Sequence, residues 1–155
     1  MSDSLFAADE QAMESLGAAI GKAMGFRGVV YLDGDLGAGK TTLSRGLIRA
    51  LGHRGAVKSP TFTLVEPYEL DAGTVYHFDL YRLLDPEELE FLGIRDYFTP
   101  DSLCLIEWPD KGAGVLPSSD LTITIATEGD GRRLHMAGHS ALGQTACRQL
   151  RDKQE

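Results

Sequence analysis

The segment from Gly34 to Thr41 constrains the fold of this chain more than any other, because it reads G-D-L-G-A-G-K-T. An apolar run that predicts a strand over 28–33 precedes it, and a pattern that predicts a helix over 41–51 follows it. Glycines let the backbone curl and bring its N–H groups close to a polyanion, at the positive end of the following helix. Strand, glycine-rich turn and helix in this order predict a phosphate-binding P-loop.

The polar residues at the end of the loop indicate a nucleotide as the ligand. We expect the Lys40 ammonium to reach the β- and γ-phosphates and neutralise charge there. The Thr41 hydroxyl is suited to bind Mg²⁺, which prefers oxygen ligands. The loop therefore predicts a nucleotide site that also binds Mg²⁺.

Two carboxylates at the ends of predicted strands are candidates for the chemistry. Asp79 lies in an apolar-rich stretch, where a carboxylate either faces the metal ion or the attacking water, or pairs structurally with Arg82 or Lys58. Glu107 closes the fully apolar run 103–106, which is typical of a strand buried in a parallel sheet. Glu107 is suited to hold Mg²⁺ through a water or to orient the nucleophile. The sequence leaves open which of the two carboxylates orients the water.

The remaining patterns predict one α/β domain over 1–155. It has a P-loop NTPase-like three-layer fold, whose mixed, largely parallel central sheet is extended by antiparallel hairpins. We expect a first helix over 9–24 and a helix that starts at Asp85. The hairpin strands and the terminal helix are expected at 61–68 with 75–81, 121–126 with 132–137, and 140–153.

Other candidates carry two interpretations each. Gln11, at the start of the first helix, belongs to a solvated first turn or touches the adenine edge. Arg132 lies near the nucleotide or is basic for solubility. The connection 53–60 and the residues just after it carry three hydroxyl groups, at Ser59, Thr61 and Thr63. These hydroxyls belong either to a phosphate-sensing switch or to an ordinary hairpin. We interpret His77 as a strand residue rather than a base.

Charge argues against direct binding of nucleic acid. The net charge is −8 and the sequence pI is about 4.9, so most of the surface repels a polyanion. Any nucleic-acid role is therefore expected to act through a protein partner. No apolar run approaches the roughly 20 residues of a membrane helix, and the two cysteines lack metal-ligand spacing. These features predict a cytoplasmic protein without a membrane segment.

Four motifs together resemble one known family. Gly34–Thr42 (GDLGAGKTT), Ser59–Pro67 (SPTFTLVEP), His77–Arg82 (HFDLYR) and Ile106–Pro109 (IEWP) occur in the order and spacing of the TsaE (YjeE) family of small bacterial P-loop ATPases. The resemblance implies a role in making N6-threonylcarbamoyladenosine beside the anticodon of tRNA. It implies TsaD and TsaB as partner proteins, with the ATPase resetting their complex and tRNA contacted only indirectly.

The resemblance also implies Mg²⁺-dependent ATP hydrolysis and a role for each site residue. Thr41 with Glu107 would bind the metal, Asp79 would serve in hydrolysis, and Trp108 would lie beside a switch at 59–63. The residues expected to bind ATP or ADP through their phosphates are Gly37, Ala38, Gly39, Lys40, Thr41 and Thr42.

Two other functions fit a P-loop domain. A small-molecule kinase on the same fold would need an acceptor site and usually a basic lid, and Arg132 and Arg133 are the only adjacent basic pair. A non-hydrolysing adaptor would use ATP binding alone to control association with a partner.

Overall fold

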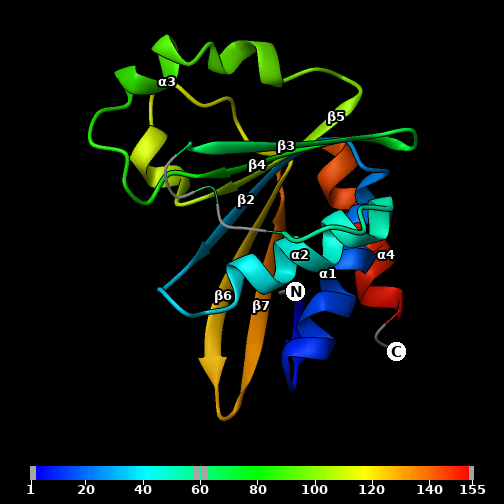
Figure 1. Cartoon of the computed structure of the whole chain (residues 1–155). Helices are drawn as coiled ribbons and strands as arrows, with labels where there is room; N and C mark the ends of the chain where they lie inside the picture. The colour runs from blue at the N-terminus through cyan, green and yellow to red at the C-terminus, as the bar shows by residue number, and fades with distance from the viewer. Residues whose placement is uncertain (1–2, 58–59, 61–62, 154–155) are drawn as a thin grey trace.

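The computed structural model describes residues 3–57, 60 and 63–153, and in this part of the chain one seven-stranded sheet has the order β1-β7-β6-β2-β5-β4-β3 (Figure 1). The strands are β1 (Asp3–Ala7), β2 (Gly28–Gly34), β3 (Val65–Leu70), β4 (Gly73–Asp79), β5 (Ser102–Glu107), β6 (Leu121–Glu128) and β7 (Gly131–Gly138). The helices are α1 (Glu10–Met24), α2 (Lys40–Leu51), α3 (Glu87–Phe91) and α4 (Ala141–Lys153), with short 3-10 turns η1 (Ile94–Tyr97) and η2 (Pro109–Gly112).

The centre of the sheet is parallel and its flanks are antiparallel. Strand β2 pairs in parallel with β5 and β6, and β4 pairs in parallel with β5. The hairpins β3–β4 and β6–β7 are antiparallel, as is the pair β1–β7. This arrangement confirms the predicted mixed, largely parallel sheet extended by hairpins. The carboxyl ends of β2, β4 and β5 therefore meet at one edge, which is where ligands bind in open α/β sheets.

Both faces of the sheet are covered, which confirms the three-layer architecture. Helices α1, α2 and α4 cover one face (Figure 1), and Leu47, Val75 and Leu105 belong to the apolar core beneath them. The segment from α3 to η2 covers the other face, where Phe78 and Ile106 belong to a second core. Every residue of β5 is buried, as expected for a strand covered on both faces. Among the described residues, none of the helices has the length and apolarity that crossing a membrane requires.

Helices α1 and α2 approach each other closely. A Cβ atom added at Gly46 of α2 would lie 2.0 Å from the backbone oxygen of Glu14 in α1. A Cβ atom at Gly17 of α1 would lie 2.0 Å from the backbone oxygen of Leu43 in α2. Glycine is needed at both positions because the two backbones leave no room for a side chain. This contact fixes α1 beside the helix that follows the P-loop.

The structure differs from the sequence predictions at the chain start and in the first hairpin. Strand β1 was not predicted, because its short sequence Asp3–Ala7 lacks a clear apolar alternation and its pairing with β7 is nonlocal. Strand β3 begins at Val65 rather than at 61, and residues 61–62 lie outside the described part of the chain. Strand β4 ends at Asp79 rather than at 81, where the Asp79 carboxylate accepts a hydrogen bond from the Tyr81 N–H.

The hydrogen bonds expected of a helix start form at Asp85, although α3 itself begins two residues later, at Glu87, with Pro86 at its N-cap. The Asp85 carboxylate accepts from the Glu87 N–H at 2.9 Å, and the Glu88 carboxylate accepts from the Asp85 N–H at 3.0 Å. These reciprocal contacts satisfy N–H groups that have no partner within the helix. They stabilise the start of the acidic helix α3.

Candidate nucleotide-binding site

The P-loop joins the end of β2 to the start of α2, as its sequence predicts. Gly37 has φ 79° and Gly39 has φ 108°, a region of backbone conformation that favours glycine. The loop is closed by a hydrogen bond from the Ala38 N–H to the Asp35 oxygen at 3.0 Å. Helix α2 begins at Lys40, so the first N–H groups of the helix face the edge of the sheet.

A cavity of about 400 Å³ gathers most of the candidate residues at this edge. Strand β4 contributes Asp79, and strand β5 contributes Glu107. The P-loop and the start of α2 contribute Gly37, Gly39, Lys40, Thr41 and Thr42. The structure thus brings the two predicted carboxylates and all of the predicted phosphate-binding residues except Ala38 to a single cavity.

Lys40 is buried and held by two contacts within the protein. Its Nζ donates to the Gly34 carbonyl oxygen at 2.5 Å and lies 3.5 Å from the centre of the Trp108 ring. Burial lowers the pKa of Lys40, while the nearby charges of Glu107 and Asp79 raise it. The ammonium therefore lies in a site whose protein charges are mainly negative, where an additional cation such as Mg²⁺ would be favoured.

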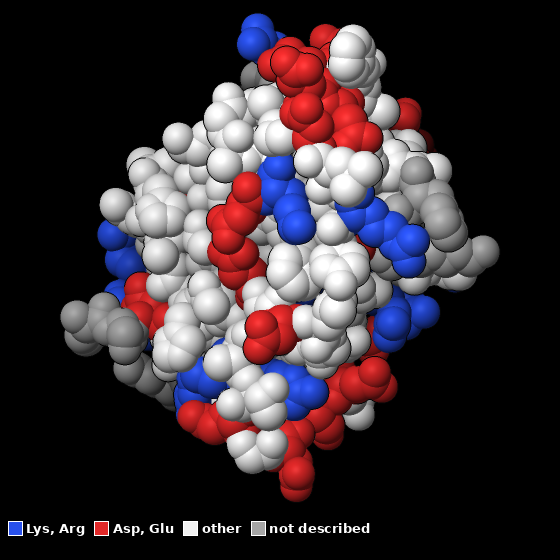
Figure 2. Space-filling view, turned by 90° about the vertical axis from the view of Figure 1, so that its left-hand side faces the viewer, with Lys and Arg blue, Asp and Glu red and all other residues white. Residues whose placement is uncertain are grey.

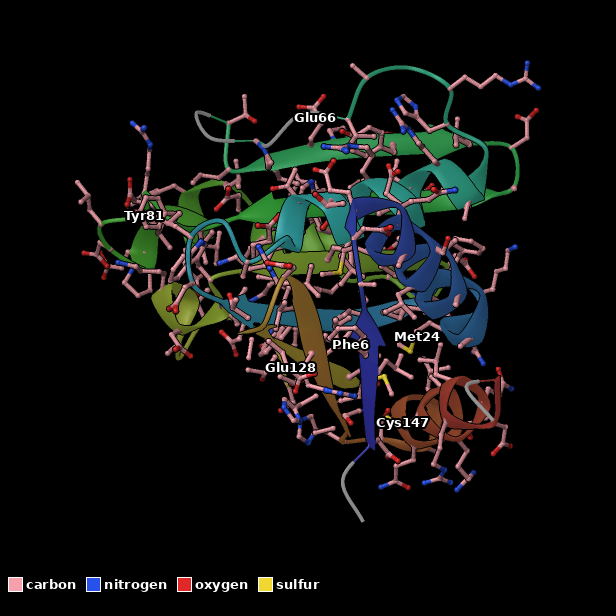
Figure 3. All side chains as sticks on the ribbon, turned by 90° about the horizontal axis from the view of Figure 1, so that it is seen from below. Phe6, Met24, Glu66, Tyr81, Glu128 and Cys147 are labelled. Atoms are coloured by element: carbon pink, nitrogen blue, oxygen red, sulfur yellow. The ribbon has the colours of Figure 1, made fainter. Side chains whose placement is uncertain are left out.

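Trp108 follows β5 directly and has a backbone conformation that is rare for a bulky residue. Its φ of 59° and ψ of 52° are left-handed, which costs energy for a side chain other than glycine. The conformation places the indole ring over Lys40 and 5.1 Å from the Tyr81 ring, measured between ring centres. In Figure 3, Tyr81 lies at the same end of the molecule as the P-loop. Trp108 therefore forms a wall of the cavity, beside the predicted catalytic groups.

Glu107 makes a close contact that sequence reasoning did not find. Its Oε2 lies 2.5 Å from Nε2 of His77, and both side chains are almost completely buried. The interpretation of His77 as a strand residue is confirmed, since it lies in β4, but its contact with a candidate catalytic residue was missed. The alternation His77, Phe78, Asp79 was the available signal, because residues two apart on a strand share a face.

Asp79 sits opposite Glu107 in the parallel register of β4 and β5. Its N–H donates to the Leu64 carbonyl oxygen at 3.0 Å, which ties the end of β4 to the segment before β3. The predicted alternative of a pair with Lys58 lies outside the described residues. Asp79 therefore lines the cavity at a position set by both neighbouring segments.

Only part of the predicted switch can be placed. Ser59 and Thr61 lie outside the described residues. Thr63 is exposed, and its hydroxyl donates to the Val65 carbonyl oxygen at 3.1 Å. Leu64 has φ 67°, so the backbone bends sharply just before β3.

A second, smaller cavity of about 170 Å³ lies on the other side of the P-loop. Arg132 of β7 lines it and donates from Nε to the Ala38 carbonyl oxygen at 3.0 Å, so this predicted residue holds the loop itself. Gln11 is exposed and lines neither cavity, whereas its neighbours Glu10 and Met13 do. On a helix, residues 10 and 13 share a face that residue 11 does not.

Three further lining residues were not among the predicted site residues, namely Leu36, Tyr81 and Arg82. Leu36 is 65% exposed, and Tyr81 is 41% exposed. Motif position offered a signal for the last two, because Tyr81 and Arg82 lie two and three residues after Asp79 in the same HFDLYR motif. All three side chains therefore belong to the lining of the larger cavity.

The surface around the site is strongly acidic in two places. Figure 2 looks at the edge where the parallel strands end, with acidic side chains gathered at the top, where α3 lies, and at the bottom, where the β6–β7 hairpin ends. The exposed residues there include Glu87, Glu90, Glu128 and Asp130. At the site itself, burial and the charge of Asp110 raise the pKa of Asp33, while Lys40 lowers it.

The donor groups in the larger cavity fit Mg²⁺. Thr41, Asp79 and Glu107 offer oxygen atoms, which are the ligands of this hard cation. Within the described ranges, no cluster of three or more His, Cys, Asp or Glu could hold a metal by itself.

Three comparisons place the chain among known proteins. The model of a family described as "Threonylcarbamoyl adenosine biosynthesis protein TsaE" matches residues 7–134. The tRNA threonylcarbamoyladenosine biosynthesis protein TsaE of Haemophilus influenzae is 58% identical over 116 residues, which cover 75% of this chain and 73% of that protein. The protein of the same name from Bacillus subtilis is 43% identical over 105 residues, covering 68% of this chain and 65% of the relative. The crystal structure of Bacillus subtilis YdiB superposes with a TM-score of 0.80 at 27% identity, covering 100% of this chain and 99% of the other.

Proposed function

This chain belongs to the TsaE family of threonylcarbamoyl adenosine biosynthesis proteins, and we propose that it serves this tRNA modification as a Mg²⁺-dependent ATPase. The observation that carries the proposal is the larger cavity. There a P-loop lysine and threonine face two carboxylates that end neighbouring parallel strands. A P-loop alone supports nucleotide binding, whereas carboxylates at the same cavity supply what hydrolysis needs.

The residues divide into groups that bind and groups that act on water. Backbone N–H groups from Gly37 to Thr42 face the phosphates, and the Lys40 ammonium neutralises charge as the γ-phosphate leaves. Asp79 orients the attacking water in line with the bond that breaks and accepts its proton. The sequence left open which carboxylate does this. The proposal assigns it to Asp79 because Glu107 is more deeply buried and already contacts His77.

Thr41 and Glu107 would hold Mg²⁺, Thr41 through its hydroxyl and Glu107 directly or through a water. When bound, the ion neutralises the charge that develops on the phosphate oxygens. The protein side chains fix the position of the nucleotide relative to these carboxylates. Because Trp108 covers one wall of the cavity, bulk water is partly excluded from Lys40.

The proposed partners follow from charge and from family membership. Net charge −8 and the acidic surfaces at α3 and at the β6–β7 hairpin oppose direct contact with tRNA. We therefore propose that the ATPase acts on a complex of TsaD and TsaB, resets it rather than transferring the carbamoyl group, and meets tRNA only through that complex. The proposed location is the cytoplasm.

Replacing Lys40 tests the proposed hydrolysis. Lys40→Ala should reduce ATP turnover at least about 100-fold, because it removes the charge that stabilises the transferred phosphoryl group. Released phosphate is measured with saturating ATP and Mg²⁺, and thermal unfolding is measured in parallel. Lys22→Ala provides the control, because Lys22 is an exposed lysine of α1 outside both cavities.

Normal turnover in folded Lys40→Ala protein would contradict the proposal. The same holds if wild-type protein binds ATP and shows no hydrolysis under any tested condition, including with TsaD and TsaB present.

A further inference from the structure

We propose that His77 is a positioning residue that holds the Glu107 carboxylate by donating a hydrogen bond from Nε2. One carboxylate oxygen is then fixed by the protein, and the carboxylate is kept facing the cavity. The hydrogen bond itself is inferred from the geometry of two buried side chains. Its expected effect on catalysis rests on the proposed ATPase function. The proposal adds a residue that neither lines the cavity nor touches the nucleotide.

The parallel register of β4 and β5 produces this contact. His77 lies opposite Leu105, and Asp79 lies opposite Glu107. Because side chains alternate along a strand, His77 and Asp79 lie on the same face of β4. Glu107 of β5 lies on that same face of the sheet. Glu107 therefore has Asp79 as its direct neighbour and His77 as its diagonal neighbour, on the face covered by α2. A strand that places Asp79 at the cavity also places His77 behind Glu107.

Burial decides which ring nitrogen carries the hydrogen. His77 is 0% exposed and Glu107 is 2% exposed, so water does not complete their hydrogen bonding. A carboxylate only accepts, so the contact at 2.5 Å requires a hydrogen on Nε2. In the described part of the chain, Nδ1 is buried and has no hydrogen-bond partner. If the hydrogen were on Nδ1 instead, its N–H group would be buried without a partner. The bare Nε2 would then lie against the Glu107 oxygen, acceptor against acceptor, which costs more free energy.

The effect of the hydrogen bond is to separate Glu107 from Lys40. The charge of Glu107 is the largest of those that raise the pKa of Lys40, so the two groups are close. Nevertheless no ion pair within 4 Å joins them among the described residues, and Lys40 instead contacts Gly34 and Trp108. A carboxylate released from His77 is free to turn toward the ammonium. With His77 in place, both charges remain directed at the ligand.

Two variants at position 77 test this role, because their side-chain amides place a hydrogen-bond donor at different distances from Glu107. The His77→Gln amide reaches the place of Nε2, whereas the shorter His77→Asn amide reaches only the place of Nδ1. We expect His77→Asn to lower kcat about 10-fold or more, as loss of such supporting hydrogen bonds typically does. ATP affinity measured without Mg²⁺ should change less than about twofold. His77→Gln should recover most of kcat.

Val75→Ala is the matched control. Val75 is equally buried, lies two residues earlier on the same face of β4, and sits opposite Leu103 rather than Glu107 in the register of β4 and β5. It should lower thermal stability and leave kcat nearly unchanged. If Val75→Ala lowers kcat as much as His77→Asn at equal loss of stability, or if His77→Asn keeps wild-type kcat, the positioning role is wrong.

The tautomer can be measured without any hydrolysis. Nitrogen chemical shifts of the His77 ring in labelled protein should show the hydrogen on Nε2, with a slowly exchanging proton resonance that moves in Glu107→Gln. A hydrogen on Nδ1 would overturn the inference. If the spectrum is as expected while wild-type protein lacks ATPase activity, the hydrogen bond stands and the proposed function fails instead.

Discussion

Lys40 and Trp108 show how single residues set the character of the site. The ammonium contacts the indole ring, and such a contact contributes about 0.5–2 kcal/mol, more when water is excluded. Trp108 adopts its left-handed backbone directly after Glu107. Strain of this kind persists where surrounding structure enforces it, and it often marks functional sites. The end of β5 therefore positions both a carboxylate and the ring that faces Lys40.

Cys104, in the middle of β5, gives the protein a predictable response to alkaline pH. Burial raises the pKa of Cys104 from 9.0 to about 12. In the unfolded chain the thiol ionises near 9.0, so between these values the folded state keeps a proton that the unfolded state has lost. The stability contributed by the thiol is therefore complete below 9.0 and falls by up to about 1.4 kcal/mol per pH unit above it.

Denaturant unfolding of wild type and Cys104→Ala checks this response. The difference in free energy of unfolding between them should shrink as pH rises above 9.0. Val30→Ala, which changes another buried position of the sheet without a titrating group, should show no such trend. A constant difference for Cys104→Ala across that range would contradict the prediction.

At the residue level, the sequence predicted what a local motif specifies. Lys40 and Thr41 could be placed because a P-loop specifies its own backbone. The contact between His77 and Glu107 could not, because it depends on β4 lying beside β5, and the two residues are 30 positions apart in the sequence. Arg132 was placed near the nucleotide by its position in the hairpin, but its hydrogen bond to the Ala38 carbonyl depends on how β7 lies against the loop.

At the level of elements, the packing of α1 on α2 is the feature most sensitive to substitution. Gly46→Ala should lower the free energy of unfolding by about 1–3 kcal/mol or more, because the added Cβ would lie 2.0 Å from a backbone oxygen of α1. The loss is expected even though Ala favours a helix over Gly by about 1 kcal/mol. Denaturant unfolding measures the change.

Gly21→Ala is the comparison for that variant. Its Cβ would meet side-chain atoms of Phe26 and Leu47 at 2.8 and 2.9 Å, and side chains adjust more easily than backbone. The loss of stability should therefore be smaller. Equal losses, or a stabilised Gly46→Ala protein, would show that α1 can move away from α2 at little cost.

Element prediction succeeded where the periodicity of the sequence was strong. The helix predicted over 9–24 is α1, and the apolar run at 103–106 lies in the fully buried β5. Strand β1 was missed because five residues give little periodicity, and its order depends on pairing with β7 and on the ion pair between Asp3 and Arg151 at 2.9 Å. Such nonlocal pairing leaves no signal in the segment itself.

At the level of the whole molecule, the net charge of −8 supports the proposal that the protein acts through protein partners rather than on nucleic acid directly. The proposed catalytic groups lie at one edge of the sheet, and acidic surfaces flank that edge above and below (Figure 2). At the opposite end of the molecule from Tyr81, Met24 of α1 and Cys147 of α4 are among the buried core residues (Figure 3). A partner that responds to the bound nucleotide would therefore contact the edge with the P-loop.

The rate of ATP hydrolysis, measured with Mg²⁺ for the protein alone and after addition of TsaD and TsaB, tests the central claim most directly. The account predicts hydrolysis that depends on Mg²⁺ and increases clearly when the partners are added, because the ATPase is proposed to reset their complex. Absence of hydrolysis in both conditions, or a full rate alone that the partners leave unchanged, would contradict it.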